Sequence, residues 1–337
     1  MPYFRAVSAL PGPLLVSLLL VSLLLASPAR ANPETCAYIP EATARLNCFD
    51  SYFTPEELPA ISSDGQAELL SEAVPALSLI EARFAQEAVL TDQWFSITPH
   101  HPNYILPLTF THDPDYADFG PLAESFSDYE IKMQLSIKTR LAQGLWRDSS
   151  VWAAYTQQSY WQLYAEDSAS APFRETNHQP EVFWQIPLDF EVFGWHARAT
   201  TLAVNHQSNG RSEPLSRSWN RVTAELAMDR GNWVISAKTW ARINESEDAD
   251  DNPNIEDYMG RLQLGVIHKR ERHTVSIGLK NNLSSPNRSG LELNYTFPLF
   301  SKLKGFVQLY SGYGENLIDM ESYNNRIGIG IALTDWL

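Results

Sequence analysis

The stretch RSWNRVTAELAM, from Arg217 to Met228, decides the fold. Every second side chain from Val222 to Met228 is apolar, whereas Arg221 and Glu225 place charges on the opposite face. A period of two predicts a β-strand whose faces meet different surroundings. Unpaired charges are too costly for the dry interior of a small β-sandwich, but a wet or hydrogen-bonded barrel lumen tolerates them.

The same alternation recurs along the chain, with turn residues such as Gly231 and Asn232 between the segments. Twelve strands are predicted, an even number that lets both chain ends meet on one side of a membrane. Their ranges are 102–112, 129–142, 148–163, 178–193, 195–208, 217–229, 232–244, 258–268, 273–281, 289–298, 305–314 and 325–336.

Strand length and aromatic placement favour a membrane barrel. Most segments reach the roughly 9–11 residues that a tilted strand needs to cross a bilayer. Aromatic residues near the strand ends are expected to form interfacial girdles, namely Tyr104, Trp146, Trp152, Trp161, Trp195, Trp219, Trp233, Trp240, Tyr310, Tyr313 and Trp336. We therefore predict an all-β protein, a twelve-stranded antiparallel transmembrane β-barrel. A soluble periplasmic β-sandwich is the alternative.

The N-terminal part has a different composition. Arg5, an apolar run from Leu14 to Leu25 and the small-x-small sequence ending at Ala31 predict a signal peptide over residues 1–31. Residues 32–98 are expected to form a periplasmic extension with helix between 66 and 90, and residues 99–337 to form the barrel domain.

The cysteines and the net charge bear on disulfide formation and on the class of binding partner. Cys36 and Cys48 are the two cysteines of the chain. In an exported protein they are expected to form a disulfide, with two free thiols as the alternative. The formal net charge is −15 and no basic stripe is present, which argues against nucleic acid as a partner.

One polar group carries possible chemistry. His206 and Ser208 lie two residues apart on a predicted strand, so they share a face, and Asn220 lies on the apolar face of the returning strand. An imidazole can activate a serine hydroxyl near neutral pH, and a carboxamide can orient the ring. The alternative is a polar hairpin loop above the membrane. No Gly-x-Ser-x-Gly elbow is present, so an α/β-hydrolase sheet is not supported.

At these residues the chain resembles outer-membrane phospholipase A of Gram-negative bacteria. The resemblance spans roughly residues 100–337 and rests on long motifs. These are PFRETN (172–177), SNGRS (208–212), SRSWNR (216–221), GNW (231–233), DDNP (250–253), YMG (258–260) and YSGYGE (310–315).

The resemblance implies a barrel in the cell outer membrane with its active site on the outer wall. Ser208 would be the nucleophile, His206 the general base and Asn220 the orienting residue. Membrane phospholipids would be the substrate, with A1, A2 and lysophospholipase activity. The resemblance also implies activation by calcium (Ca²⁺) and by homodimerisation, with the ion helping to form an oxyanion hole through bound water. The alternative is a catalytically silent channel or adhesin that kept the family's sequence.

The resemblance also implies calcium ligands, all hard oxygens. The carbonyl of Arg211 and the hydroxyl of Ser216 match family ligands, and the partner subunit's Ser170 would add a carbonyl. A second site, of the monomer, maps to Glu213, Ser216 and Asp251. Glu213 stands where the family usually has aspartate, and the register of Ser170 follows a one-residue insertion.

Two further positions depart from, or extend, the family pattern. Gln157 matches a polar residue of the dimer contact, with a lumen or surface glutamine as the alternative. The chain ends Trp336-Leu337, whereas such barrels usually finish on an aromatic residue. The remaining histidines are interpreted as structural or solvent-facing, because their sequence spacing does not suggest metal binding.

Overall fold

The computed structural model describes residues 36, 39, 41–50, 77–90, 96–166, 170–246, 250–300 and 303–335. The expected signal peptide lies outside these residues, as does Trp336. The chain divides into two compact units, Met1–Pro75 and Ala76–Leu337. Within the described ranges, no helix is long and apolar enough to cross a membrane.

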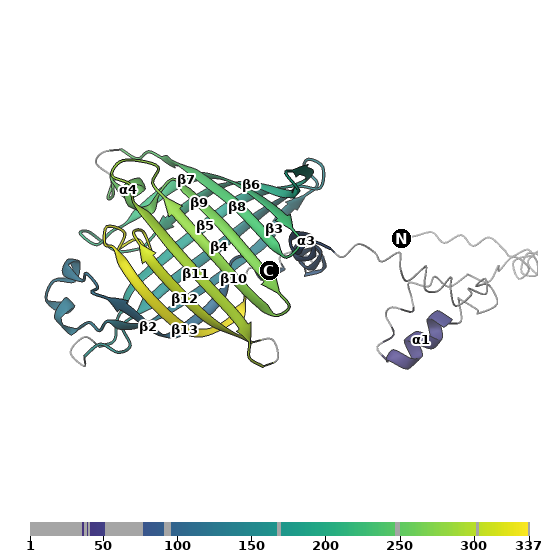
Figure 1. Cartoon of the computed structure of the whole chain (residues 1–337), viewed down its shortest axis with the longest axis horizontal. Helices are drawn as coiled ribbons and strands as arrows, with labels where there is room; N and C mark the ends of the chain where they lie inside the picture. The colour runs from purple at the N-terminus through teal and green to yellow at the C-terminus, as the bar shows by residue number, and fades with distance from the viewer. Residues whose placement is uncertain are drawn as a thin grey trace, which may run out of the picture. The chain divides into compact units, whose positions relative to one another are not determined.

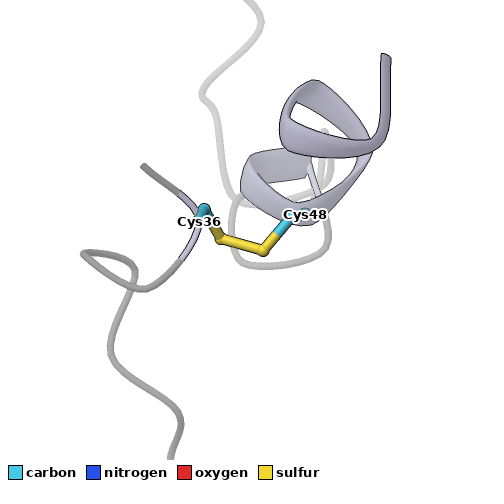
Figure 2. The surroundings of a disulfide bond; sticks show 2 residues. All are labelled: Cys36 and Cys48. Atoms are coloured by element: carbon cyan, nitrogen blue, oxygen red, sulfur yellow. A yellow bond between two sulfur atoms is a disulfide. The ribbon is translucent and has the colours of Figure 1, made fainter. Parts of the chain in front are cut away.

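In the first unit, a short helix is tied to the segment before it. Helix α1 (Ala42–Asp50) contains Cys48, which forms a disulfide with Cys36 across a Cα–Cα distance of 5.6 Å (Figure 2). Arg45 Nη1 also donates to the carbonyl of Ile39 at 3.0 Å. A cross-link that closes a short loop restricts the unfolded chain and so stabilises the folded segment.

The second unit is a closed β-barrel (Figure 1). Among the described residues, twelve antiparallel strands form a ring in which each strand pairs with its sequence neighbours, and β13 pairs with β2. The strands are β2 (Asn103–His112), β3 (Tyr129–Gln143), β4 (Ser150–Trp161), β5 (Phe173–Val192), β6 (Trp195–Ser208), β7 (Ser218–Arg230), β8 (Trp233–Ile243), β9 (Leu262–Arg270), β10 (His273–Asn281), β11 (Ser289–Pro298), β12 (Lys304–Gly312) and β13 (Asn324–Thr334). The short strand β1 (Ile97–Pro99) pairs with residues 137–139 of β3, beyond residues 129–134 that pair with β2. This confirms the predicted twelve-stranded barrel.

Two strands begin four or five residues away from their predicted starts, whereas the other ten begin within two residues of them. The strand expected from residue 258 begins at Leu262, because residues 255–259 form the helix α4 (Ile255–Met259). Gly260, at a φ of 86°, ends this helix, and a Cβ there would lie 2.9 Å from the carbonyl oxygen of Asn281. Strand β5 begins at Phe173 rather than 178, because its pairing with β4 continues as far as Trp161.

The two faces of the barrel wall are chemically distinct. On β6 and β7, Leu202, Val204 and Val222 point outward and are exposed, whereas Trp219 and Arg221 point inward and are buried. The alternation seen in the sequence therefore separates an apolar outer wall from a polar lumen.

Several aromatic residues expected in the girdles point into the barrel instead. Trp219 and Trp240 pack beneath α4 against Met259, in a buried apolar cluster at one end of the lumen. Tyr104, Trp152 and Tyr310 are also buried. For these five residues the girdle prediction was wrong, because large rings near strand ends also fill the narrow lumen. Trp146 and Trp233 are exposed, as a girdle requires.

Buried ion pairs cross the lumen near the end where α4 lies. The guanidinium of Arg174 lies 3.0 Å from Glu130 and 2.7 Å from Asp319. Glu315 accepts from Lys132 at 3.0 Å and from Arg326 at 3.1 Å. Charges buried in this way are tolerated because every one of these partners is paired.

The opposite end has short turns and a helix. Residues 193–194, 231–232 and 271–272 join strands there, and short turns mark the periplasmic end of such barrels. Helix α3 (Leu79–Leu90) lies at this end, where Glu87 pairs with Lys138 at 2.7 Å and Glu81 accepts from Arg198 at 2.7 Å. The longer loops, including 209–217 and 244–261, are at the other end.

Candidate active site

The hairpin of β6 and β7 places the candidate residues. In its register His206 lies directly opposite Asn220, and Ser208 lies opposite Ser218. Directly opposed residues in an antiparallel pair have side chains close enough to interact. His206 and Ser208 share the outward face with Val204, which is 58% exposed. The imidazole, hydroxyl and carboxamide therefore gather on the outer wall, at the end of the strands that carries the longer loops.

The contact between His206 and Asn220 determines the tautomer of the neutral imidazole. His206 Nδ1 lies 2.9 Å from Asn220 Oδ1. An amide oxygen only accepts hydrogen bonds, so the proton of a neutral ring in this contact is on Nδ1. The lone pair is then on Nε2, which is the atom a general base needs.

Ser208 lies one pleat beyond His206, where β6 ends. Its backbone is paired with His178 on β5 and with Ser218 on β7. In the part of the chain that the structure describes, Ser208 Oγ makes no hydrogen bond to the imidazole. Contacts between nucleophile and base are often looser before a substrate is bound.

A carboxylate that the sequence analysis did not single out completes this group. Asn220 Nδ2 donates to Glu245 Oε1 at 2.7 Å. Among the acidic residues between 245 and 251, the sequence indicated a ligand role for Asp251 alone. A signal existed, because Ile243 is paired with Asn220 and points outward, so the residue two positions later continues on the same face.

The side chain of Asn209 forms hydrogen bonds across the loop that follows Ser208. This side chain is buried, donates to the carbonyl of Leu215 at 2.8 Å, and accepts from the backbone of Arg217 at 3.0 Å. Gly210 follows at a φ of 64°, in the left-handed region that favours glycine. The nine-residue connection between the strands is therefore an ordered loop that begins directly after Ser208.

The structure brings together two of the expected calcium ligands. Ser216 Oγ donates to Asp251 Oδ2 at 2.5 Å, across two different loops. Glu213 is exposed and, among the described residues, its side chain makes no hydrogen bond or ion pair. Arg211 donates from its guanidinium to the carbonyl of Arg174 at 2.6 Å. Ser170 is exposed in the loop between β4 and β5, at a φ of 54°.

Gln157 belongs to a polar group on the outer wall. It accepts from the hydroxyl of Tyr155 at 3.2 Å and donates to Ser159 at 3.2 Å. The same tyrosine hydroxyl lies 2.7 Å from His178 Nδ1. This group lies on β4 and β5, beside the strand that carries His206 and Ser208.

A histidine pair in the lumen was missed. His100, His101 and Glu181 place possible ligand atoms within 4.8 Å of one another, and His100 Nε2 lies 2.6 Å from Glu181 Oε1. The spacing in the sequence had suggested no such group, because Glu181 is brought in from β5. Lys138 and Lys238 lie near these histidines and disfavour a further cation. We therefore interpret His100 and Glu181 as a buried hydrogen-bonded pair.

Comparison with known proteins assigns the chain to a family. A family model described as Phospholipase A1 matches residues 80–333. The chain belongs to the phospholipase A1 family. Phospholipase A1 of Klebsiella pneumoniae is 38% identical over 247 residues, which cover 72% of this chain and 84% of that protein. Phospholipase A1 of Escherichia coli K12 is 37% identical, covering 72% and 83%.

Solved structures agree with this assignment. Outer membrane phospholipase A from Escherichia coli superposes with a TM-score of 0.68 at 36% identity, covering 72% of this chain and 100% of that chain. A Salmonella typhi outer membrane phospholipase, solved as a dimer with bound calcium, gives a TM-score of 0.69 at 35% identity, covering 74% and 96%. As a member of this family, the chain is a phospholipid-hydrolysing barrel protein of the Gram-negative outer membrane.

Proposed function

We propose that this protein is a calcium-dependent serine hydrolase that cleaves acyl esters of membrane phospholipids, with A1, A2 and lysophospholipase activity. Ser208 is the nucleophile, His206 the general base and Asn220 the orienting residue. The observation that carries the proposal is the 2.9 Å contact between His206 and Asn220 on the outer wall, beside Ser208. One solved structure of the Escherichia coli relative is an active-site mutant in which an asparagine is replaced by alanine.

The proposed chemistry follows from the tautomer of His206. Nε2 removes the proton of Ser208 Oγ as that oxygen bonds to the acyl carbonyl carbon. The imidazolium then gives this proton to the ester oxygen of the glycerol, whose bond to the acyl carbon breaks. Water enters, loses a proton to Nε2 and attacks the acyl-enzyme, which releases the fatty acid and restores the serine hydroxyl.

The position of the site suits a substrate that is itself a lipid. The exposed side chains of Val204 and Val222 flank His206 and Asn220 on the outer wall. Acyl chains can lie along this apolar surface while the ester group reaches the end of β6. A neutral orienting residue costs less to desolvate there than a carboxylate would.

The loop residues fit a calcium ion by their chemistry. Ser216 and Asp251 already meet at 2.5 Å and offer the hard oxygens that calcium prefers. The carbonyl of Arg211 would complete one site with the partner subunit's Ser170, and Glu213 would join Ser216 and Asp251 in another. Bound calcium would stabilise negative charge on the oxygen of the acyl carbonyl.

Homodimerisation would bring the Ser170 carbonyl of a second copy to this site. The polar group around Gln157 lies on the outer wall, where isolated polar side chains facing lipid are costly. Pairing two such groups across a dimer would satisfy them better than lipid does. The dimeric, calcium-bound Salmonella typhi relative supports both parts of this proposal.

Replacing the nucleophile tests the proposal. Purified Ser208→Ala is expected to remain a heat-modifiable barrel and to release fatty acid from phospholipid micelles at under roughly a thousandth of the parental rate. Ser218→Ala, one strand away, removes a hydroxyl from the opposed position and serves as the control. Normal fatty-acid release by Ser208→Ala would refute the assignment.

A further inference from the structure

Glu245 continues the outward face of β8 beyond the end of that strand. Ile243 is the Cα partner of Asn220, and Glu245 follows two residues later. Its side chain is partly buried, and Oε1 accepts a hydrogen bond from Asn220 Nδ2 at 2.7 Å. Together with the 2.9 Å contact to His206, this makes a continuous chain from imidazole to amide to carboxylate.

The amide of Asn220 has two ends with opposite properties. Only Oδ1 can accept a hydrogen bond from the Nδ1–H group of His206, whereas the flipped amide would turn its N–H₂ group toward that donor. An ionised carboxylate accepts hydrogen bonds and donates none. Glu245 therefore holds the nitrogen end of the amide, and this leaves the oxygen end facing the ring.

The charge of Glu245 has no other partner in the described residues. No lysine, arginine or histidine there forms an ion pair with it, and Asn220 is its one hydrogen-bond partner among them. The carboxylate is instead committed to the amide that orients the imidazole.

We propose that Glu245 is a positioning residue for the hydrolytic reaction. It fixes the orientation of the Asn220 amide and polarises it, so that the amide oxygen becomes a better acceptor for His206. The arrangement keeps the negative charge at the loop, away from hydrocarbon, and relays its effect through a neutral group. This inference rests on the proposed roles of Ser208, His206 and Asn220.

Substitutions of Glu245 test the positioning role. Glu245→Ala is expected to lower kcat roughly five- to thirtyfold, the value of one net hydrogen bond, with KM nearly unchanged. Glu245→Gln keeps an accepting oxygen and is expected to fall between Glu245→Ala and the parent. Glu256→Gln removes a charge from the same loop at a residue that pairs with Arg261, and should leave kcat unchanged.

A double variant gives a readout that a merely structural role would not move. Asn220→Asp places a second carboxylate against Glu245, and two such groups cannot both ionise in contact. Asn220→Asp should therefore lose activity. The double variant with Glu245→Gln should have a kcat at least about tenfold above that of Asn220→Asp alone, because the glutamine amide can donate to the introduced carboxylate.

The outcomes separate this inference from the proposed function. If Ser208→Ala abolishes hydrolysis but Glu245→Ala keeps the parental kcat, the positioning role is wrong and the nucleophile assignment stands. A double variant no more active than Asn220→Asp also overturns the positioning role. Heat-modifiable mobility of each variant in gels shows that the barrel has folded, and Glu245→Gln remains a test if Glu245→Ala fails to fold.

Discussion

Asn220 illustrates how single residues adapt the site to lipid. In the proposed mechanism, an amide beside exposed Val222 orients His206 without placing a charge against hydrocarbon. The carboxylate that strengthens it, Glu245, sits one hydrogen bond further away, in a loop. At this scale the chemistry depends on which end of each side chain faces its neighbour, because amides and imidazoles both have distinct donor and acceptor ends.

The pair of Ser216 and Asp251 makes the calcium proposal testable at the same scale. Asp251→Asn removes one negative charge from a set of oxygen ligands, so half-maximal activity should require roughly tenfold more calcium. Titration of fatty-acid release against free calcium measures this shift. Asp257→Asn, which removes a charge from α4, is the matched control. Activity that persists in excess chelator would contradict the calcium dependence itself.

Among the elements, the loop between β12 and β13 folds back into the lumen. It carries Glu315. Burial by itself would raise the pKa of this carboxyl, but the cations Arg326 and Lys132 outweigh that effect and hold the pKa below its usual value. A lowered folded-state pKa contributes stability that is present above the unfolded pKa and is lost as pH falls through the folded one. The loop is therefore fastened to the barrel wall at neutral pH and weakened in strong acid.

Glu315→Gln tests this anchoring. The substitution leaves Lys132 and Arg326 buried with less compensating charge, and breaking such a pair costs about 3–5 kcal/mol. We expect a lower unfolding temperature in detergent, followed by the loss of heat-modifiable mobility. The difference between parent and variant should begin to shrink as pH falls below about 4.3, the ordinary glutamate pKa that applies to the unfolded chain, and should vanish only below the lowered pKa of the folded state. A variant as stable as the parent at pH 7 would contradict the expected contribution of the ion pairs.

At the scale of the whole molecule, the lumen is obstructed at both ends. The ion pairs around Glu130 and Glu315 cross it near the loops, and α3 is held at the turn end through Lys138 and Arg198. A cavity of about 400 Å³ lies along the lumen, lined by residues from α3 at one end to Glu315 at the other. This architecture supports chemistry on the outside of the wall and disfavours transport through it.

The obstructed lumen predicts that the protein is not a channel. Purified protein in planar bilayers should give no stable conductance steps, whereas a porin measured under the same conditions should. A stable ion-selective pore together with no release of fatty acid would favour the alternative of a catalytically silent channel. Conductance is measured with Ser208→Ala as well, so that hydrolysis of the bilayer cannot imitate a pore.

The sequence by itself determined the strands and their faces, because side-chain alternation is a local property that each segment carries alone. It placed His206, Ser208 and Asn220 on one outer face for the same reason. Only the tertiary structure decided that Glu245 meets Asn220, that Glu181 meets His100, and that Trp219 and Trp240 fill the lumen. These contacts join segments whose mutual register and loop paths are set by the closed barrel as a whole, and alternation along one strand carries no information about them.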